Sequence, residues 1–234
     1  MNIVVTGASK GIGKAVAEAF AQKFPGCHLF LCSRHMSGTM AWQQGLTSNH
    51  GCRVTTFDAD LSKREGVEAF ADQLMAACDM VDVLVNNAGF FEPGSVHDEP
   101  EGTLERMLDI NLYSAYHLTR RLVPGMKARR SGHVFNICSV AALQAYPNGG
   151  AYSISKWALL GFSRNLREEM KPHGVKVTAV HPGATLTASW DGFDIDPTRI
   201  MESEDVAAMI VTAASLSPQA CVEDILLRPQ LGDL

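Results

Sequence analysis

Three residues in the second half of the chain could together move a proton. Tyr152 and Lys156 are four residues apart, so their side chains would lie on one face of a helix. A phenol, whose reference pKa is about 10, is a poor acid or base near neutral pH, and a nearby ammonium favours its ionised form. Ser139 follows an apolar run and can donate a hydrogen bond to a substrate oxygen on which charge develops. These residue types suit the reduction of a carbonyl, although a Tyr-x-x-x-Lys pair alone also fits a solvated helix face.

A glycine-rich turn near the N-terminus could bind a nucleotide. Gly7, Gly11 and Gly13 follow an apolar run at residues 3–5 and open a segment of helical period. Glycine allows a tight turn and lets the backbone approach a pyrophosphate, whose charge is attracted by the N–H groups at a helix start. The spacing is Gly-x-x-x-Gly-x-Gly rather than the common Gly-x-Gly-x-x-Gly. We therefore expect dinucleotide binding, with a purely structural turn as the alternative.

The same turn partly matches two other motifs. Residues 7–11 fit the Gly-x-Ser-x-Gly elbow of the α/β-hydrolases, with Ser9 as the nucleophile. That elbow needs an acid and then a histidine later in the chain, and the last histidine, His181, has no obvious acid in a matching place. The phosphate-binding Walker loop is excluded, because Ala8 replaces its first glycine and Ala15 replaces its serine or threonine.

The residues after the second expected strand bear on the choice between NAD and NADP. Folds that prefer NAD usually place an acid here, which binds the ribose hydroxyls. This chain has Arg34 in that region and Lys10 in the glycine turn. Two cations suit the additional 2′-phosphate of NADP. We expect NADP(H) as the cofactor, the alternative being that Arg34 is only a solvated loop residue.

Short β-branched runs alternate with segments of helical period, which is the pattern of a parallel sheet wrapped by helices. Most runs are apolar at consecutive positions, as in strands buried on both faces. The expected fold class is α/β: a single domain, residues 1–234, with a Rossmann-type doubly wound parallel sheet of about seven strands and helices on both faces. The expected strands cover residues 2–6, 28–32, 53–58, 81–86, 133–138, 176–180 and 224–227.

Helices are expected between these strands. One follows the glycine turn, another opens with a capping box at residues 62–65, and long helices cover about 103–129 and 151–171. The longest irregular stretch covers about residues 183–202, and loops of that length in compact domains are usually functional or mobile.

Composition narrows the classes of function. A chain of 234 residues that is 46% hydrophobic and 19% charged is typical of a globular protein, and its net charge of −5 argues against a nucleic-acid partner. The six cysteines contain no Cys-x-x-Cys pair and the eight histidines no His-x-x-x-His pair, so neither a disulfide framework nor a metal site is expected. No apolar stretch approaches the roughly 18 residues of a membrane span. We expect a cytoplasmic protein that binds neither nucleic acid nor membrane.

In their order along the chain, these and further motifs resemble the short-chain dehydrogenase/reductase family over nearly the full length. The similar motifs are the glycine turn 6–13, Asp60-Leu61, Asn86-Asn87-Ala88-Gly89, Asn111, Ser139, the segment 152–156 and the segment 182–187. Each motif is modest, but their order and spacing together are specific. The C-terminal residues 228–234 weakly resemble sepiapterin-reductase-like members.

The resemblance implies a role for each residue of a catalytic set. Tyr152 would be the general acid in the direction of reduction, and Ser139 would position the carbonyl. Lys156 would hold the nicotinamide ribose and lower the Tyr152 pKa. Asn111 would hold a water that relays protons through Lys156.

The resemblance also implies a cofactor site. Asp60 would lie near the adenine, Asn87 and Gly89 would shape the groove, and Thr185 and Thr187 would lie near the carboxamide. The full set of expected cofactor-binding residues is Gly7, Ser9, Lys10, Gly11, Ile12, Gly13, Arg34, Asp60, Leu61, Asn87, Ala88, Gly89, Tyr152, Lys156, Pro182, Gly183, Thr185 and Thr187.

Large side chains flank the catalytic motifs and suggest an apolar or aromatic carbonyl substrate, although core or subunit contacts would explain them equally well. They are Phe90, Phe91, Leu143, Tyr146 and Trp190. Trp190 lies in the irregular stretch and is the best candidate for a lid residue. In the resembling family the long helices pack subunits together, which implies a homodimer or homotetramer.

The expected function is that of an NADPH-dependent oxidoreductase, which interconverts a small carbonyl compound and an alcohol by hydride transfer with a tyrosine as general acid and base. One alternative is a binding module that senses NADP(H) without doing chemistry. A less favoured alternative is a serine hydrolase that uses Ser9.

Overall fold

The computed structural model describes residues 1–187 and 196–233, in which strands and helices alternate. The strands are β1 (Asn2–Thr6), β2 (His28–Ser33), β3 (Arg53–Asp58), β4 (Val83–Asn86), β5 (Gly132–Ile137), β6 (Val175–Pro182) and β7 (Asp224–Leu227). The helices are α1 (Gly11–Lys23), α2 (Met40–His50), α3 (Arg64–Ala77), α4 (Thr103–Leu108), α5 (Ser114–Arg129), α6 (Gly150–Met170) and α7 (Ser203–Ala214).

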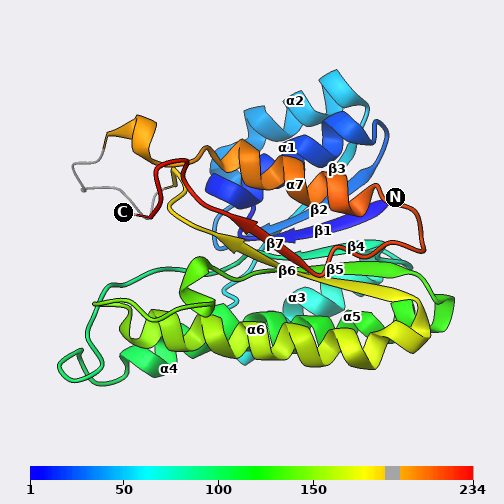
Figure 1. The fold of residues 1–234 in the computed structure, drawn as a ribbon. Coiled ribbons are helices and arrows are strands. Elements are labelled where there is room, and N and C mark those ends of the chain that lie inside the picture. Colours follow the sequence, from blue (N-terminus) through cyan, green and yellow to red (C-terminus); the bar gives the residue numbers. More distant parts are fainter. Residues whose placement is uncertain (188–195, 234) are drawn as a thin grey trace.

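The strands form one parallel sheet in the order β3-β2-β1-β4-β5-β6-β7 (Figure 1). The chain builds outwards from β1 to β3 and then crosses back to β4, so the winding direction reverses between β1 and β4. Doubly wound sheets bind their ligands at the carboxyl ends of the strands beside such a switch point. The predicted fold class is confirmed. β6 is longer than expected because its pairing with β7 continues to Pro182.

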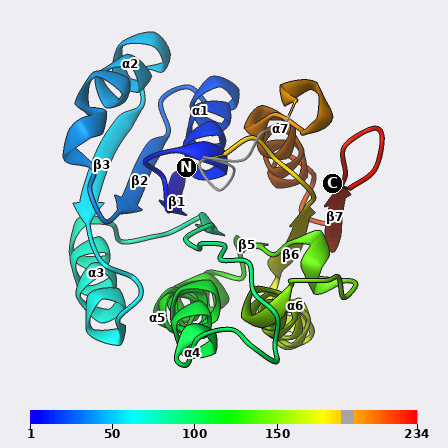
Figure 2. The ribbon, with the colours of Figure 1, turned by 90° about the vertical axis from the view of Figure 1, so that its left-hand side faces the viewer.

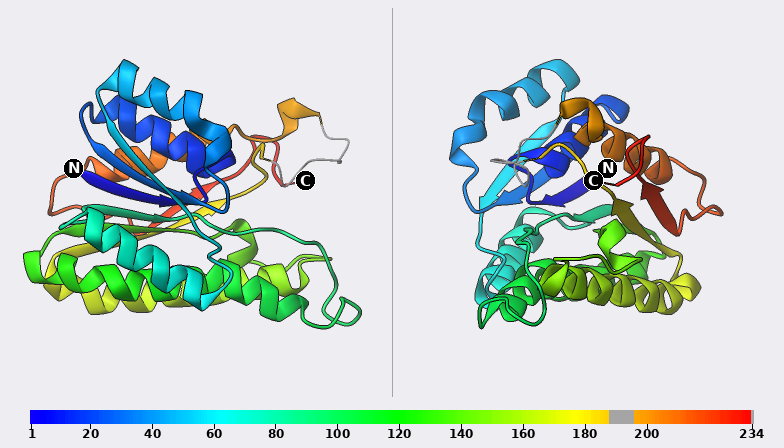
Figure 3. Two further views of the ribbon diagram at one scale, coloured as in Figure 1. Left: turned by 180° about the vertical axis from the view of Figure 1, so that it is seen from behind. Right: turned by 60° about the vertical axis from the view of Figure 1, so that its left-hand side comes forward.

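Helices cover both faces of the sheet. α1, α2 and α7 form one layer and α3, α4, α5 and α6 form the other, as Figure 2 shows along the sheet and Figure 3 from two further directions. α1 packs against α7, and α3 packs against α5. Because both faces are covered, the strands are apolar at consecutive positions, as the sequence predicts.

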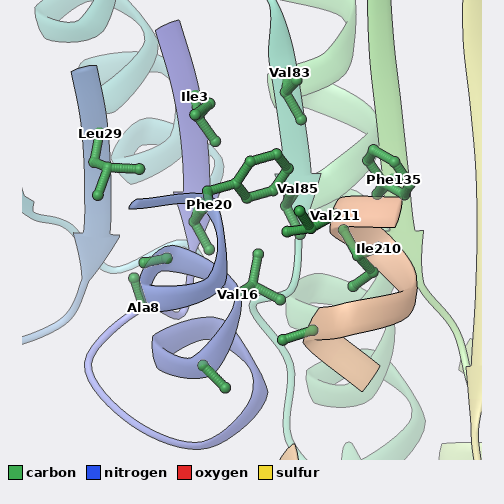
Figure 4. Packing of buried hydrophobic residues seen from close by; sticks show 14 of the residues in the cluster. Ile3, Ala8, Val16, Phe20, Leu29, Val83, Val85, Phe135, Ile210 and Val211 are labelled. Carbon is green, nitrogen blue, oxygen red and sulfur yellow. The ribbon is translucent and has the colours of Figure 1, made fainter. Parts of the chain in front are cut away.

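The core beneath α1 and α7 fixes the start of α1 at the end of β1. The fully buried ring of Phe20 lies among Ile3, Val83 and Val85, which come from the two central strands (Figure 4). Val16, one turn earlier in α1, is buried in the same cluster. Full burial of a side chain of this size contributes about 1.5–3 kcal/mol. This packing holds the glycine turn at the switch point.

Two expectations about helices require correction. The capping box predicted at residues 62–65 is wrong, because the Asp60 carboxylate accepts both the N–H (3.1 Å) and the hydroxyl (2.6 Å) of Ser62, and α3 begins only at Arg64. The helix predicted over 103–129 is interrupted by a π-helical turn, Asp109–Tyr113, which separates α4 from α5. Such turns insert an extra residue and occur often at functional sites.

Candidate active site

Side chains at the switch point join the carboxyl ends of β1 and β4. The Thr6 hydroxyl accepts the backbone N–H groups of Asn87 (3.0 Å) and Ala88 (2.9 Å). The Asn87 amide in turn donates to the carbonyls of Thr6 (2.9 Å) and Gly7 (3.2 Å). Two predicted cofactor segments, residues 7–13 and 87–89, therefore meet here. The sequence suggested no separate role for Thr6. The feature that could have indicated this role is a hydroxyl at the last position of a buried strand.

The glycine turn has the shape that a pyrophosphate site requires. Gly7 and Gly11 have φ angles of +66° and +55°, which strongly favour glycine. A Cβ at Gly13 would lie 2.4 Å from both the Gly7 carbonyl and Asn87 Nδ2, so α1 starts too close to the turn for any side chain there. Among the described residues, no N-cap side chain and no first-turn acid occupies the start of α1. Its N–H groups are thus available to an anion.

The residues expected around the adenosine end gather beyond β1 and β2. Ser9 Oγ lies 2.9 Å from Ser33 Oγ, which links the glycine turn to the end of β2. Arg34, the next residue, is exposed, and so is Lys10. Both cations are therefore accessible to an anionic ligand. Ile12 differs from them, because its side chain packs partly buried against the core.

Asp60 and Leu61 are adjacent but have different surroundings. Hydrogen bonds from Ser62 lower the pKa of Asp60, and the positive charge of Arg34 adds to this effect. Asp60 lies just after β3 and is exposed. It is close enough to Arg34 for the two charges to interact. The Leu61 side chain is buried in the core with α3, so only its backbone is left for cofactor contact.

Ser139 and Tyr152 lie close enough to interact. Ser139 follows β5 in an extended conformation, and its Oγ accepts the N–H of Ala141 at 3.1 Å. Burial raises the pKa of Tyr152 to about 12, while the hydrogen bond with Ser139 acts in the opposite direction. Burial, and not the lowering by Lys156 that the sequence suggests, therefore dominates the pKa of Tyr152 in this arrangement.

Lys156 is a buried cation next to this pair. Its side chain is 6% exposed, and its Nζ donates to the Ile137 carbonyl at 2.8 Å. Nζ lies 5.7 Å from the centre of the Tyr152 ring. Burial lowers the pKa of Lys156 to about 8. A Cβ at Gly89 would lie 3.6 Å from this Nζ and 2.7 Å from Asn111 Oδ1, so a glycine is needed where these side chains converge.

Asn111, in the π-helical turn, connects two segments of the site. Its amide nitrogen donates to the Phe90 carbonyl (3.1 Å) and to Ser155 Oγ (3.0 Å), and its oxygen accepts the Phe90 N–H (3.0 Å). Ser155 also donates to the Tyr152 carbonyl at 2.7 Å. Asn111 is thereby attached through Ser155 to α6, the helix that carries Tyr152 and Lys156. The sequence did not indicate this part of Ser155 in the site. The feature that marks Ser155 is a fully buried hydroxyl directly before Lys156.

The segment after β6 returns to the glycine turn. Gly183 follows Pro182 and donates its N–H to the Leu227 carbonyl at 2.8 Å, which extends the sheet by one residue. Thr185 is buried, and its hydroxyl donates to the Gly183 carbonyl at 3.0 Å. A Cβ at Gly11 would lie 3.1 Å from Thr187 Cγ2. Thr187 therefore lies against the predicted cofactor turn, whereas the Thr185 hydroxyl binds within its own loop.

His181 has an acid partner, Asp224, but this acid follows the histidine in the chain, so the order that the hydrolase elbow needs is still not met. Its Nε2 lies 2.8 Å from Asp224 Oδ1, and its Nδ1 lies 3.3 Å from the Ser139 carbonyl. Both ring nitrogens face these oxygens, while Ser9 Oγ contacts Ser33. The pair therefore does not complete a hydrolase triad with Ser9.

The large side chains that suggest an apolar substrate have different positions. Phe91 packs edge-to-face on Tyr152, with ring centres 4.9 Å apart and an angle of 82° between the rings. Phe90 and Tyr146 are each 39% exposed. Leu143 packs against the core cluster beneath α6. Trp190, the predicted lid residue, lies outside the described residues.

Residues 1–187 and 196–233 contain no group of three or more His, Cys, Asp or Glu side chains that could hold a metal ion. In the same residues, no helix combines the length and the apolar character needed to cross a bilayer.

Comparison with known proteins adds a family assignment to this geometry. A family model described as short chain dehydrogenase matches residues 1–196. The chain belongs to this family. A sepiapterin reductase from Chlorobaculum tepidum is 32% identical to it over 237 residues, which cover 99% of this chain and 97% of the relative. The resemblance inferred from the sequence motifs is therefore confirmed.

Solved structures with the same fold include several oxidoreductases. A metagenomic short-chain oxidoreductase in complex with NADP is 31% identical, with a TM-score of 0.84 over 98% of this chain and 97% of that one. An alcohol dehydrogenase from Thermococcus sibiricus, complexed with 5-hydroxy-NADP, is 27% identical, with a TM-score of 0.90 over 98% and 96%. L-sorbose reductase from Gluconobacter frateurii, complexed with NADPH and L-sorbose, is 27% identical, with a TM-score of 0.88 over 97% and 94%.

Proposed function

We propose that this short-chain dehydrogenase is an NADPH-dependent oxidoreductase that interconverts a small carbonyl compound and an alcohol. The observation that carries the proposal is the buried Lys156 ammonium 5.7 Å from the centre of the Tyr152 ring, with Ser139 close enough to the phenol to lower its pKa. The set stands at the carboxyl end of the sheet, beside the glycine turn. A solvated helix face would not explain a lysine that is only 6% exposed, because lysines are rarely buried without a specific reason.

The residues present fit a dinucleotide phosphate. The first turn of α1 would hold the pyrophosphate, because its N–H groups face a turn that the three glycines keep narrow. Arg34 and Lys10 would bind the 2′-phosphate, and Thr187 lies against the same turn. Solved relatives that contain NADP or NADPH support this cofactor. When bound, the cofactor supplies the hydride.

The protein's own groups would supply the proton and stabilise charge. At neutral pH a phenol with a pKa of about 12 is protonated, so Tyr152 can donate its proton to the substrate oxygen in the direction of reduction. Ser139 can donate a second hydrogen bond to that oxygen as charge develops. Lys156 has a pKa of about 8, so its proton is exchangeable near neutral pH and can replace the one that Tyr152 gives up.

The surroundings of Tyr152 support an apolar or aromatic carbonyl as the substrate. Phe91 contacts the Tyr152 ring, the backbone of Phe90 is hydrogen-bonded to Asn111, and Tyr146 is close enough to influence the pKa of Tyr152. The relative named sepiapterin reductase makes a pterin-type carbonyl a useful member of a substrate panel. We further propose a cytoplasmic homodimer or homotetramer.

The test is the Tyr152→Phe variant. Loss of turnover for every carbonyl that the wild type reduces, with NADPH affinity retained, is the expected result, because the substitution removes only the proton donor. Full activity would refute the assignment. A wild type that binds NADPH but reduces no carbonyl in a broad panel would favour the sensing module. Labelling of Ser9 by a fluorophosphonate would favour the hydrolase.

A further inference from the structure

The helix that carries Tyr152 and Lys156 receives its cap from a distant loop. α6 begins at Gly150, and its N-cap residue, Gly149, has no side chain with which to cap it. The carboxylate of Glu99 instead accepts the N–H of Ala151, with Oε2 3.1 Å from the nitrogen. Glu99 lies in the β4–α4 loop (residues 87–102), which leaves the sheet at the end where α6 starts (Figure 1).

The local backbone is shaped to let this carboxylate approach. Gly150 has a φ of +37°, and a Cβ there would lie 2.5 Å from Glu99 Oε2 and 2.4 Å from the Gly94 carbonyl. The Gly94 N–H donates to the Asn148 carbonyl at 3.2 Å, and Ser95 Oγ donates to Asn148 Oδ1 at 2.8 Å. The β4–α4 loop is therefore fastened to the start of α6 by several polar contacts, and Glu99 makes the one that reaches the helix itself.

The other part of the same loop contacts the catalytic residues. The backbone of Phe90 exchanges two hydrogen bonds with the Asn111 side chain, and the Phe91 ring packs edge-to-face on Tyr152. One end of the loop thus touches two members of the catalytic set, while the other end caps the helix on which Tyr152 sits. A shift of the loop would move Phe91 and the first turn of α6 together.

We infer that Glu99 is a positioning residue of the active site, a claim that rests on the proposed function for its kinetic consequence. A side-chain oxygen that accepts a first-turn N–H stabilises the start of a helix, and a negative charge there is favoured by the helix dipole. Tyr152 is the residue directly after the capped Ala151. Glu99 therefore holds the backbone from which the phenol reaches the substrate, and it does so without touching substrate or cofactor.

Three variants separate capping from charge. Glu99→Ala removes the acceptor, Glu99→Gln keeps an acceptor without charge, and Asp98→Ala removes a neighbouring carboxylate that is 66% exposed. For Glu99→Ala we expect hydrogen exchange at the Ala151 amide to become roughly tenfold faster, and kcat to fall by a comparable factor. The Kd for NADPH should not change, because the glycine turn is untouched. Glu99→Gln should recover most of both losses, and Asp98→Ala should behave as wild type.

The two readouts keep this inference separate from the proposed function. Hydrogen exchange at the Ala151 amide reports whether Glu99 caps α6, and it does so even if the protein reduces no carbonyl. In that case the proposed function fails, but the exchange experiment still tests the cap. Glu99→Ala with wild-type exchange and wild-type kcat would overturn the inference. So would an Asp98→Ala variant as impaired as Glu99→Ala. Should Glu99→Ala unfold, Glu99→Asp, whose shorter side chain cannot reach Ala151 equally well, tests the same contact.

Discussion

The hydroxyl of Thr6, the last residue of β1, accepts the N–H of Ala88 beyond the end of β4 at 2.9 Å. Backbone pairing between these two strands extends as far as Val5 and Val85. The contact of Thr6 therefore continues the junction past the sheet, into the two turns that would enclose the cofactor. A single buried side chain helps to set the distance between them.

Thr6→Val should destabilise the protein and weaken NADPH binding. Valine has nearly the shape of threonine but leaves the N–H groups of Asn87 and Ala88 without their acceptor. An unsatisfied buried donor costs about 1–3 kcal/mol. Because both of these N–H groups are only partly buried, the free energy of unfolding should fall by about 2–4 kcal/mol, the lower part of the range for two donors. Urea denaturation and titration of NADPH fluorescence measure the two effects. Thr56→Val, in β3 and away from the switch point, is the matched control, and equal behaviour of both variants would contradict the prediction.

Ser139→Ala should slow turnover and displace the pH profile. The substitution removes the hydrogen bond that opposes the burial-raised pKa of Tyr152, so this pKa should rise further. Alcohol oxidation requires the ionised phenol and should therefore need a higher pH, while kcat for reduction should fall about 10²–10³-fold. Steady-state kinetics in both directions over a range of about pH 6–10, which brackets the Lys156 pKa of about 8, test this. Ser153→Ala removes a nearby buried serine that donates to the Ala141 carbonyl at 2.8 Å, and it should keep the wild-type profile.

Arg34→Ala should reduce the preference for NADPH over NADH. Charge-assisted hydrogen bonds to a phosphate are worth about 1.5–3 kcal/mol, so NADPH affinity should fall about 10–100-fold while NADH affinity stays unchanged. Isothermal titration with each cofactor gives both numbers. Arg53→Ala removes an exposed arginine from β3 and serves as the control. Equal losses for the two cofactors would show that Arg34 does not read the 2′-phosphate.

His133 should make the protein sensitive to acid. Its ring is 5% exposed, and Nε2 lies 2.7 Å from the oxygen of Thr178, which itself donates to the Val222 carbonyl. Burial lowers the pKa of His133 from 6.5 to about 3. Between these values the unfolded chain binds a proton that the folded chain does not, so the free energy of unfolding falls as the pH falls, by up to about 1.4 kcal/mol per unit.

The His133→Gln variant checks this window. Denaturation curves from pH 7 down to about 4 should show a shallower loss of stability than in the wild type. His97→Gln, whose side chain is 83% exposed in the native protein, should leave the slope unchanged. Identical slopes for wild type and His133→Gln would show that His133 is not the source of the acid sensitivity.

The fold was predictable because its signals are local. Consecutive apolar residues mark β1 and β2, and the glycines at positions 7, 11 and 13 mark the turn between β1 and α1. The proposed catalytic pair of Tyr152 and Lys156 was equally accessible, because the two residues are separated by one turn of a single helix.

Contacts between distant segments could not be predicted in this way. The bond from Ala151 to Glu99 joins residues 52 positions apart, and that from His181 to Asp224 joins residues 43 apart. Neither carboxylate differs in the sequence from those exposed elsewhere. The capping box predicted at Ser62 was wrong because of a contact between close neighbours. The type and spacing of Ser62 fit a helix cap, but its hydroxyl donates to the carboxylate of Asp60, two residues earlier. The pKa of Tyr152 also depends on burial, which spacing does not report.

The π-helical turn Asp109–Tyr113 makes the active site dependent on the number of residues in a helix as well as on their chemistry. Deleting one residue there would remove the extra residue that the π-helical turn accommodates, so a regular helix would form and the side chains of the turn would take new directions. Asn111 would then point away from Phe90 and Ser155. A frame-preserving loss of one codon at this place should therefore harm the enzyme more than most exchanges of one side chain for another.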